Sequence, residues 1–278
     1  MQLPNYVIAR LIARVSSVAP GFRSRFQTAV IRAAYSTISV LLKVDDLPFL
    51  NYGYVPLDGS HMGGLKLNPE DERDRFSIQL YYRVAGGRDL RGKDVLEIGC
   101  GRGGGSSFIA RYLHPASLTG VDLSDRAVRY CRRRHRVDGL KFLRGDAEHL
   151  PLPSHSFDAV VNVESSHCYP SFERFLDEVV RVLRPGGLFL FADLRPREEI
   201  ARLREQLSKR FTVVEEEIIT PNVVRALELD SDRRRLLIEK RAPRFLHRAL
   251  ETFASVNGTP TFSAFASGGL QYVRFVLQ

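Results

Sequence analysis

A glycine-rich loop between a predicted strand and a predicted helix constrains the fold of this chain most. Residues 95–98 are mostly apolar and short enough for a buried strand, and a helix is predicted at about 105–113. Between them lies the run Gly99-Cys100-Gly101-Arg102-Gly103-Gly104. Glycines allow a tight turn and a close approach of the backbone to a ligand. This arrangement predicts a parallel α/β sheet that binds a ligand at the carboxyl end of the strand.

The same alternation continues along the chain. Further strands are predicted at 118–122, 140–144, 157–163 and 188–193, and helices at about 70–84, after Ser124 and at 172–183, the last ended by the turn Arg184-Pro185-Gly186-Gly187. Strands that alternate with helices indicate a doubly wound, Rossmann-like sheet, mostly parallel. Two alternating segments, 211–219 and 270–276, are expected to complete the sheet, the last strand antiparallel.

Two regions are expected around this sheet. Residues 1–69 are interpreted as a helical cap followed by an entrance loop at 45–69. Residues 70–278 are interpreted as the ligand-binding domain, with a helical insert at about 221–253. Ile8, Leu11 and Val15 have helical spacing. This basic segment, free of acids before Asp45, also resembles a transit peptide, but amphipathic cap helices are favoured. Whether they contact a membrane or cover an apolar substrate is left open.

The charge of the chain widens the range of partners. Its formal net charge is +9 and its pI is about 9.7, so nucleic acid, anionic lipid or an acidic substrate are all compatible. The basic run 126–136 has no aromatic ladder, which favours a solvated helix face over a nucleic-acid site. The three cysteines form neither a disulfide framework nor a zinc pattern, so no metal and a cytoplasmic location are expected.

The acidic residues identify the ligand. Gly99, Gly101 and Gly104 also satisfy the dinucleotide-binding pattern, so glycine spacing alone is ambiguous. A carboxylate at Glu97 would repel a pyrophosphate but suits an ammonium group and a sulfonium cation. Asp122, at the end of the second strand, is placed to accept both ribose hydroxyls. These acids favour S-adenosylmethionine over a nicotinamide dinucleotide.

Later motifs agree with this choice. Asp146 is expected to receive the adenine amino group and Ala147 to donate its backbone N–H. The successive motifs match class I methyltransferases, with S-adenosylhomocysteine as product. The predicted cofactor-binding residues are Tyr81, Glu97, Gly99, Cys100, Gly101, Gly103, Asp122, Leu123, Asp146, Ala147, Glu148 and Glu164. Tyr81 and Tyr82 either close over the cofactor or form a packed aromatic pair.

Motifs outside these loops carry a more specific resemblance. They are Leu113-His114-Pro115-Ala116-Ser117, Glu164-Ser165-Ser166-His167-Cys168-Tyr169-Pro170 and Ala192-Asp193-Leu194-Arg195-Pro196, together with Gly101-Arg102-Gly103-Gly104-Gly105 and Gly145-Asp146-Ala147-Glu148. From 89 to 195, and more weakly elsewhere, the chain resembles the phthiotriol/phenolphthiotriol dimycocerosate methyltransferases. The resemblance implies O-methylation of a hydroxyl on a lipidic or polyketide-type natural product. Asn51-Tyr52-Gly53-Tyr54 and the loop 59–67 depart from the family, so substrate identity transfers less well than reaction type.

Two residues are candidates for the proton transfer that an alcohol acceptor requires. His167 follows the fourth strand, and the pKa range of histidine suits proton acceptance. Asp193, at the end of the fifth strand, could orient His167 or act as the base itself. Alternatively, His167 only ties down the turn at Tyr169-Pro170. Cys168 lacks the surroundings of a nucleophile and is expected to be a buried neighbour.

Other functions stay open at this point. The basic balance allows an RNA methyltransferase, which would bind RNA in a salt-sensitive way. The chain could also hold the cofactor without transferring methyl, as a binding module or a natural-product cyclase, or it could methylate carbon or nitrogen. A homodimer is compatible with the sequence.

Overall fold

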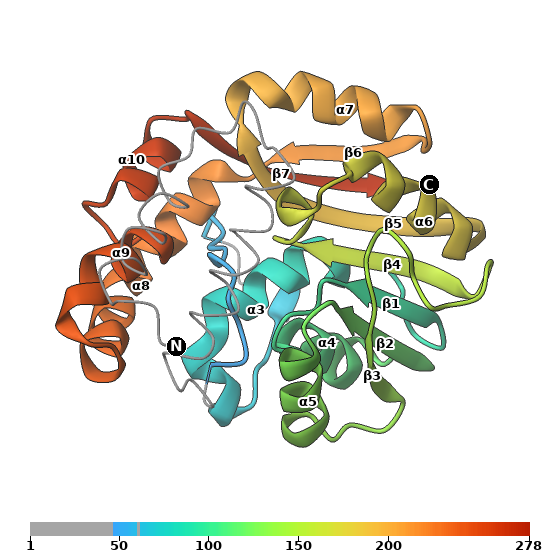
Figure 1. Ribbon diagram of the computed structural model, residues 1–278, viewed down its shortest axis with the longest axis horizontal. Helices are drawn as coiled ribbons and strands as arrows, with labels where there is room; N and C mark the ends of the chain where they lie inside the picture. The colour runs from blue at the N-terminus through green and yellow to red at the C-terminus, as the bar shows by residue number, and fades with distance from the viewer. Residues whose placement is uncertain (1–46, 60–61) are drawn as a thin grey trace, which may run out of the picture.

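A single seven-stranded sheet organises the computed structural model, which describes residues 47–59 and 62–278 (Figure 1). The strand order is β3-β2-β1-β4-β5-β7-β6, and β7 runs antiparallel to both of its neighbours while the other pairs are parallel. The strands are β1 Asp94–Ile98, β2 Ser117–Asp122, β3 Leu140–Arg144, β4 Phe157–Val163, β5 Leu183–Pro196, β6 Val213–Ile218 and β7 Leu270–Leu277. The predicted doubly wound sheet with an antiparallel last strand is confirmed.

Helices and short turns connect these strands. They are η1 Met62–Gly64, η2 Pro69–Asp74, α3 Arg75–Tyr81, η3 Tyr82–Gly86, α4 Gly104–Phe108, η4 Ile109–Leu113, α5 Asp125–Arg134, η5 Ser166–Cys168, α6 Phe172–Val182, η6 Arg197–Glu199, α7 Ile200–Ser208, α8 Thr220–Arg241, η7 Arg244–Leu246, α9 His247–Phe253 and α10 Pro260–Ala266. Ser124 caps α5 as predicted, accepting a hydrogen bond from the backbone N–H of Ala127. Within the described ranges, no helix is long and apolar enough to cross a membrane.

The two faces of the sheet carry different helices. On one face α6 and α7 bury Phe175, Val179 and Leu203 against the phenylalanines of β5. On the other face α3, α4, α8 and α10 pack over β1, β4 and β7, and α5 covers β3 through Phe142. Because strand residues alternate between the two faces, both apolar layers come from the same strands. The sheet is therefore a rigid support for residues at its carboxyl edge.

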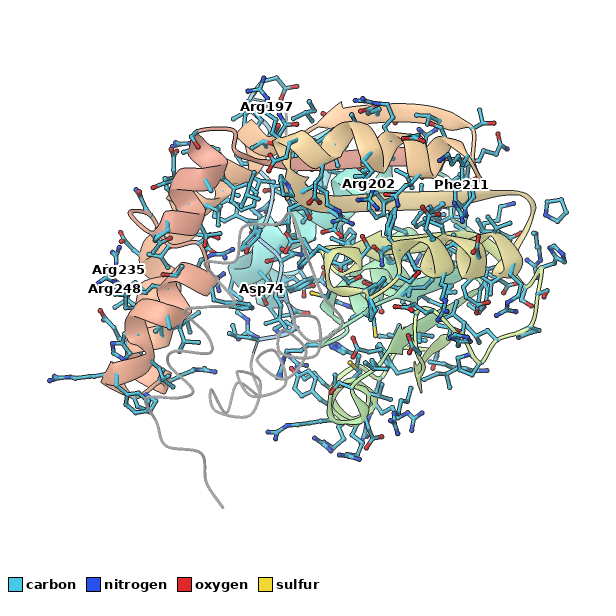
Figure 2. The ribbon with its side chains drawn as sticks, turned by 45° about the horizontal axis from the view of Figure 1, so that its top comes forward. Asp74, Arg197, Arg202, Phe211, Arg235 and Arg248 are labelled. Atoms are coloured by element: carbon cyan, nitrogen blue, oxygen red, sulfur yellow. The ribbon has the colours of Figure 1, made fainter. Side chains whose placement is uncertain are left out.

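The helices α8, α9 and α10 form a cap beyond the carboxyl ends of the parallel strands (Figure 1). The predicted insert at about 221–253 corresponds to α8 and α9, whereas α10 was not predicted. Asp74 of η2 lies inside the molecule beside the cap, 3.9 Å from the Arg233 guanidinium, and Arg235 and Arg248 lie on the outer side of the cap (Figure 2). The cap is thus held by a charged contact to η2 as well as by the apolar contacts of α8 and α10 with the sheet.

Two local predictions were wrong. Arg184-Pro185-Gly186-Gly187 was predicted as a turn between the helix at 172–183 and a strand at 188–193, but α6 ends at Val182 and β5 already begins at Leu183, which pairs with Phe157. The glycine-containing segment is a bulge, after which Leu188 pairs with Ala159. The single helix predicted at 70–84 is instead the succession η2, α3 and η3. The N-terminal helices predicted around Ile8 to Val15 lie outside the described residues.

Candidate active site

A cavity of about 730 Å³ opens at the carboxyl ends of β1, β2, β3 and β4. Ligands of parallel α/β sheets bind at this edge, next to the point where the strand order reverses. Nine of the predicted cofactor-binding residues line it: Tyr81, Gly99, Cys100, Gly101, Asp122, Leu123, Asp146, Ala147 and Glu164. Five predicted site residues are not on its wall: Glu97, Gly103, Glu148, His167 and Asp193.

The glycine loop shapes the floor of the cavity. Gly101 has a φ of +53°, and a Cβ added there would project into open space. A Cβ at Gly99 would overlap the Ser165 hydroxyl, and one at Gly105 would overlap the ring of Tyr81. The loop therefore needs glycine for two reasons. Gly101 keeps room for a ligand, whereas Gly99 and Gly105 allow close packing.

Glu97 lies one layer behind the cavity wall. Its side chain is 1% exposed, and it accepts hydrogen bonds from the Tyr81 hydroxyl at 2.7 Å and from the Ser106 hydroxyl. Burial raises the pKa of Glu97 to about 7. The sequence predicted that this carboxylate contacts the cofactor itself. In the structure it fixes Tyr81, whose ring lines the cavity.

Asp122 is the acid that meets the cavity at the end of β2. One carboxylate oxygen accepts the backbone N–H of Gly101 at 2.9 Å, and the other accepts that of Ser124 at 2.8 Å. Burial raises the pKa of Asp122. No ion pair to Asp122 occurs in the described ranges, so its remaining lone pairs are available for hydroxyl donors of a ligand.

These features fit S-adenosylmethionine. The amide of Gly101, which a phosphate would need, is already bound to Asp122. Leu123, 39% exposed on the wall, offers an apolar surface to a base, and Asp146 and Ala147 follow at the end of β3. Glu148, by contrast, turns away and accepts the backbone N–H of Ser171 at 2.9 Å. The wall therefore suits a sugar and a base without a pyrophosphate.

His167 and Asp193 form a buried pair behind the wall. His167 Nδ1 lies 2.7 Å from Asp193 Oδ1, and the carboxylate is fully buried. Burial alone would lower the pKa of His167, but Cys168 and Asp193 raise it to about 10. Although burial opposes ionisation, His167 and Arg195 hold the pKa of Asp193 well below its usual range. The role of either residue as the base stays a prediction.

The side chain of Glu164 lines the cavity and contacts the entrance loop. Glu164 directly follows β4, and its Oε1 accepts the backbone N–H of Tyr52 at 2.8 Å. Cys168 lies on the wall, half-buried, rather than buried as expected. Tyr82 packs edge-on against Phe108 instead of closing over the cavity. Glu164 is therefore the one predicted site acid from the β4–β5 half of the described sheet that reaches the wall.

Sequence reasoning missed part of this wall. Pro48, Phe49, Leu50 and Asn51 line the cavity, and the Pro48 carbonyl accepts the N–H of Gly104 at 3.1 Å. On α5, residues Arg126, Tyr130 and Arg133 also line it. The entrance loop was predicted as a region, but no pattern in it pointed to particular residues. The α5 residues could have been predicted from the position of Asp122, because a helix that begins beside this acid has one face toward the ligand site.

The sheet order, the glycine loop and the acids at three successive strand ends define a class I S-adenosylmethionine-dependent methyltransferase. Residues 96–191 match a family model described as a methyltransferase domain. The fold is similar to that of a cyclopropane synthase from Mycobacterium tuberculosis, with a TM-score of 0.67 and 16% identity over 91% of this chain and 98% of that one.

The family follows from closer relatives. The phthiotriol/phenolphthiotriol dimycocerosates methyltransferase of Mycobacterium tuberculosis is 43% identical over 266 residues, 94% of each chain. A fatty-acid O-methyltransferase of Mycolicibacterium smegmatis is 46% identical over 213 residues, 76% of this chain and 77% of that one. The chain belongs to the phthiotriol/phenolphthiotriol dimycocerosates methyltransferase family.

Proposed function

We propose that this enzyme transfers the methyl group of S-adenosylmethionine to an oxygen of a lipidic or polyketide-type acceptor, with a hydroxyl as the preferred acceptor group. The observation that carries the proposal is the 43% identity over 94% of both chains to a methyltransferase named for phthiotriol lipids. The second relative, named as a fatty-acid O-methyltransferase, supports oxygen as the receiving atom.

The mouth of the cavity supports an apolar acceptor. Phe49 and Leu50 line it, and Leu50 is 46% exposed. Exposed apolar side chains at a cavity mouth provide a surface for a hydrocarbon chain. Cys168 and Val163 extend this apolar wall on the β4 side. An alkyl chain can therefore lie beside the entrance loop while its polar end points toward Glu164.

This chain's own residues bind and orient in the reaction. When bound, the cofactor supplies an electrophilic methyl carbon on a sulfonium that leaves as a neutral thioether. Asp122 and Asp146 hold the nucleoside, Glu97 fixes Tyr81, and the entrance loop lines one side of the cavity. In-line transfer depends on placing the acceptor oxygen close to the methyl carbon, so positioning by these groups accounts for much of the catalysis.

Product mass tests the proposal. The purified protein is incubated with S-adenosylmethionine and, in separate reactions, a long-chain diol, a long-chain fatty acid and RNA. A gain of one methylene unit on the diol, absent with Asp122→Ala, supports the proposed function. Methylation of RNA alone, or a lipid of unchanged mass, contradicts it. Salt-sensitive RNA binding without lipid methylation would favour the RNA methyltransferase instead.

The proposal extends to where the enzyme works. We place it in the cytoplasm, with its basic N-terminal segment against a membrane that presents the lipid, and with a homodimer as its assembly. Sedimentation with anionic vesicles, with and without residues 1–46, tests the contact. The particle mass in solution tests the dimer.

A further inference from the structure

Glu164 lines the cavity together with the glycine loop that follows β1. It is the first residue after β4, at the centre of the sheet beside β1. We propose that Glu164, rather than His167, accepts the proton of the acceptor hydroxyl during methyl transfer. This inference rests on the proposed function and adds the residue that performs its proton transfer.

The backbone holds Glu164 in a costly conformation. Its φ is +49°, in the left-handed region that non-glycine residues rarely adopt. Its N–H donates to the carbonyl of Ala192 on β5 at 2.9 Å, which ties the residue to the sheet. Strained non-glycine residues persist only where the surrounding structure fixes them, and they cluster at functional sites. The strain turns the chain at the end of β4 and leaves the Glu164 side chain on the cavity wall.

The entrance loop holds the carboxylate of Glu164. Tyr52 N–H donates to Glu164 Oε1 at 2.8 Å, and the Tyr52 carbonyl accepts from Arg234 of α8 at 3.1 Å. Tyr272 of β7 lies close enough to Glu164 to have its own pKa raised by it, and its buried hydroxyl has no hydrogen bond of normal geometry within the described ranges. Glu164 is therefore fixed in place but lightly hydrogen-bonded, as a proton acceptor must be.

The ionisation of Glu164 suits the task. Burial raises its pKa to about 7, against the opposing effects of Tyr52, Tyr272 and His167, while Asp193 raises it further. Tyr81 of α3 is the remaining titratable neighbour, and burial together with the negative charges of Glu97 and Glu164 raises its pKa. A base works best when its pKa is near the working pH.

The two alternatives are less suited. With a pKa of about 10, His167 already carries its proton at neutral pH. Asp193 is a weak base, because its pKa is held well below the usual range. Neither side chain lines the cavity. The pair instead holds η5, and with it Cys168, against β5.

In the proposed step, the acceptor hydroxyl gains the methyl group and loses its proton to Glu164. The hydroxyl oxygen forms a bond to the methyl carbon while the carbon–sulfur bond breaks, and that electron pair stays on sulfur. The hydroxyl proton passes to the Glu164 carboxylate. The products are a methyl ether, a neutral thioether and a protonated Glu164, which then returns its proton to solvent.

Turnover of two acceptors provides the first test. Glu164→Gln keeps the shape of the side chain but cannot accept the proton, so methylation of a long-chain diol is expected to slow by at least about 100-fold. With S-adenosylmethionine below saturation, the wild-type diol rate is expected to rise with pH near 7, because it then reports the ionisation of the cofactor-free enzyme, and this rise is expected to disappear in the variant. A fatty acid is already ionised, so its methylation by the variant is expected to be unaffected or faster. Asp74→Asn is the matched control, because Asp74 is a buried carboxyl with a raised pKa outside the cavity.

Binding without turnover provides the second test. A nearby sulfonium favours the ionised form of Glu164. S-adenosylmethionine is titrated calorimetrically, without acceptor, in buffers of different ionisation enthalpy at pH 7. The wild-type protein and Asp74→Asn are expected to release about half a proton more than Glu164→Gln.

The outcomes separate the two proposals. If the wild-type protein methylates no hydroxyl, the proposed function fails, and the role of Glu164 as the base fails with it. If hydroxyls are methylated but Glu164→Gln matches the wild type in diol rate and proton release, only the assignment of Glu164 is overturned. Loss of the diol rate in His167→Gln but not in Glu164→Gln would return the role to His167.

Discussion

The imidazole of His167 and the carboxylate of Asp193 are 2.7 Å apart in the buried layer between η5 and β5. The same carboxylate accepts the backbone N–H of His167 at 2.9 Å and the hydroxyl of Ser166 at 2.5 Å, and Arg195 lies 3.0 Å away. The backbone N–H of Leu194 donates to it at 2.8 Å, so Asp193 gathers five donors from two segments. This network fixes the segment that follows Glu164 and Ser165, so its first effect is on stability.

The pH dependence of stability tests this ion pair. The folded-state pKa of His167 is about 10, above its ordinary value of 6.5. A raised pKa contributes stability that is full below pH 6.5 and lost as the pH rises through about 10. The free energy of unfolding in urea should therefore favour wild type over His167→Gln most at pH 6, and the difference should shrink by pH 10. A difference that does not change with pH would mean that His167 is neutral in the fold.

Two glycines of the cofactor loop should respond differently to alanine. At Gly101 the added Cβ would enter the cavity, so Gly101→Ala is expected to weaken S-adenosylhomocysteine binding more than it lowers stability. At Gly105 the Cβ would overlap the Tyr81 ring, so Gly105→Ala should lower the free energy of unfolding by about 1 to 3 kcal/mol. Thermal unfolding with and without S-adenosylhomocysteine measures both effects. Both variants lose some stability, because the φ of +53° at Gly101 strains alanine, so the assignment is contradicted if S-adenosylhomocysteine stabilises Gly101→Ala as much as Gly105→Ala.

The sheet was predictable because its signals are local. Each strand from β1 to β4 is a segment of five to seven residues with apolar residues at its centre, and a glycine or an acid stands at or directly after its end, which is sufficient to predict a parallel sheet. The segment Pro185-Gly186-Gly187 was interpreted as a turn between a helix and a strand, but the same residue types also occur in bulges within a strand. Only the pairing of Leu183 with Phe157 distinguishes a bulge from a turn here. Composition alone cannot supply that long-range pairing.

Sequence motifs give the residue types at the candidate site but not how deeply each side chain lies in the fold. Glu97 and Asp122 were both assigned to the cofactor, but only Asp122 lies on the wall. The difference depends on Tyr81 of α3 and Ser106 of α4, which both donate hydrogen bonds to Glu97 of β1. Likewise, the low pKa of Asp193 and the high pKa of His167 arise from contacts that no spacing reveals. Tertiary contacts, rather than sequence motifs, decide which acid reaches the cavity wall.

Asp122 provides the direct test of cofactor placement. Asp122→Ala removes the acceptor of the Gly101 and Ser124 amides as well as the proposed acceptor of the ribose hydroxyls. Hydrogen bonds to a charged group contribute about 1.5 to 3 kcal/mol each, so the affinity for S-adenosylhomocysteine should fall roughly 100-fold or more. Calorimetry measures this loss, and Asp138→Ala, a change at an exposed carboxylate between α5 and β3 that does not line the cavity, serves as comparison. Unchanged affinity in Asp122→Ala would remove the cofactor from this strand end.

Arg234 links the cap to the entrance loop, and its removal should release both. Its guanidinium pairs with Asp230 at 2.8 Å and donates to the carbonyls of Asn51, Tyr52 and Ala254. Arg234→Ala leaves three carbonyls without their donor, so the free energy of unfolding should fall by about 2 kcal/mol or more. The entrance loop should also become sensitive to limited proteolysis, because its anchoring contacts are lost.

Arg235→Ala is the matched control for this change. Arg235 lies on the outer side of the cap and pairs with Asp232, whose side chain is 91% exposed (Figure 2). Exposed pairs of this kind contribute between about 0 and 1 kcal/mol, so neither stability nor loop proteolysis should change measurably. Because Tyr52 carries the contact from Arg234 to Glu164, Arg234→Ala should also slow diol methylation, whereas Arg235→Ala should not. If the two variants behave alike, Arg234 does not hold the entrance loop against the active site.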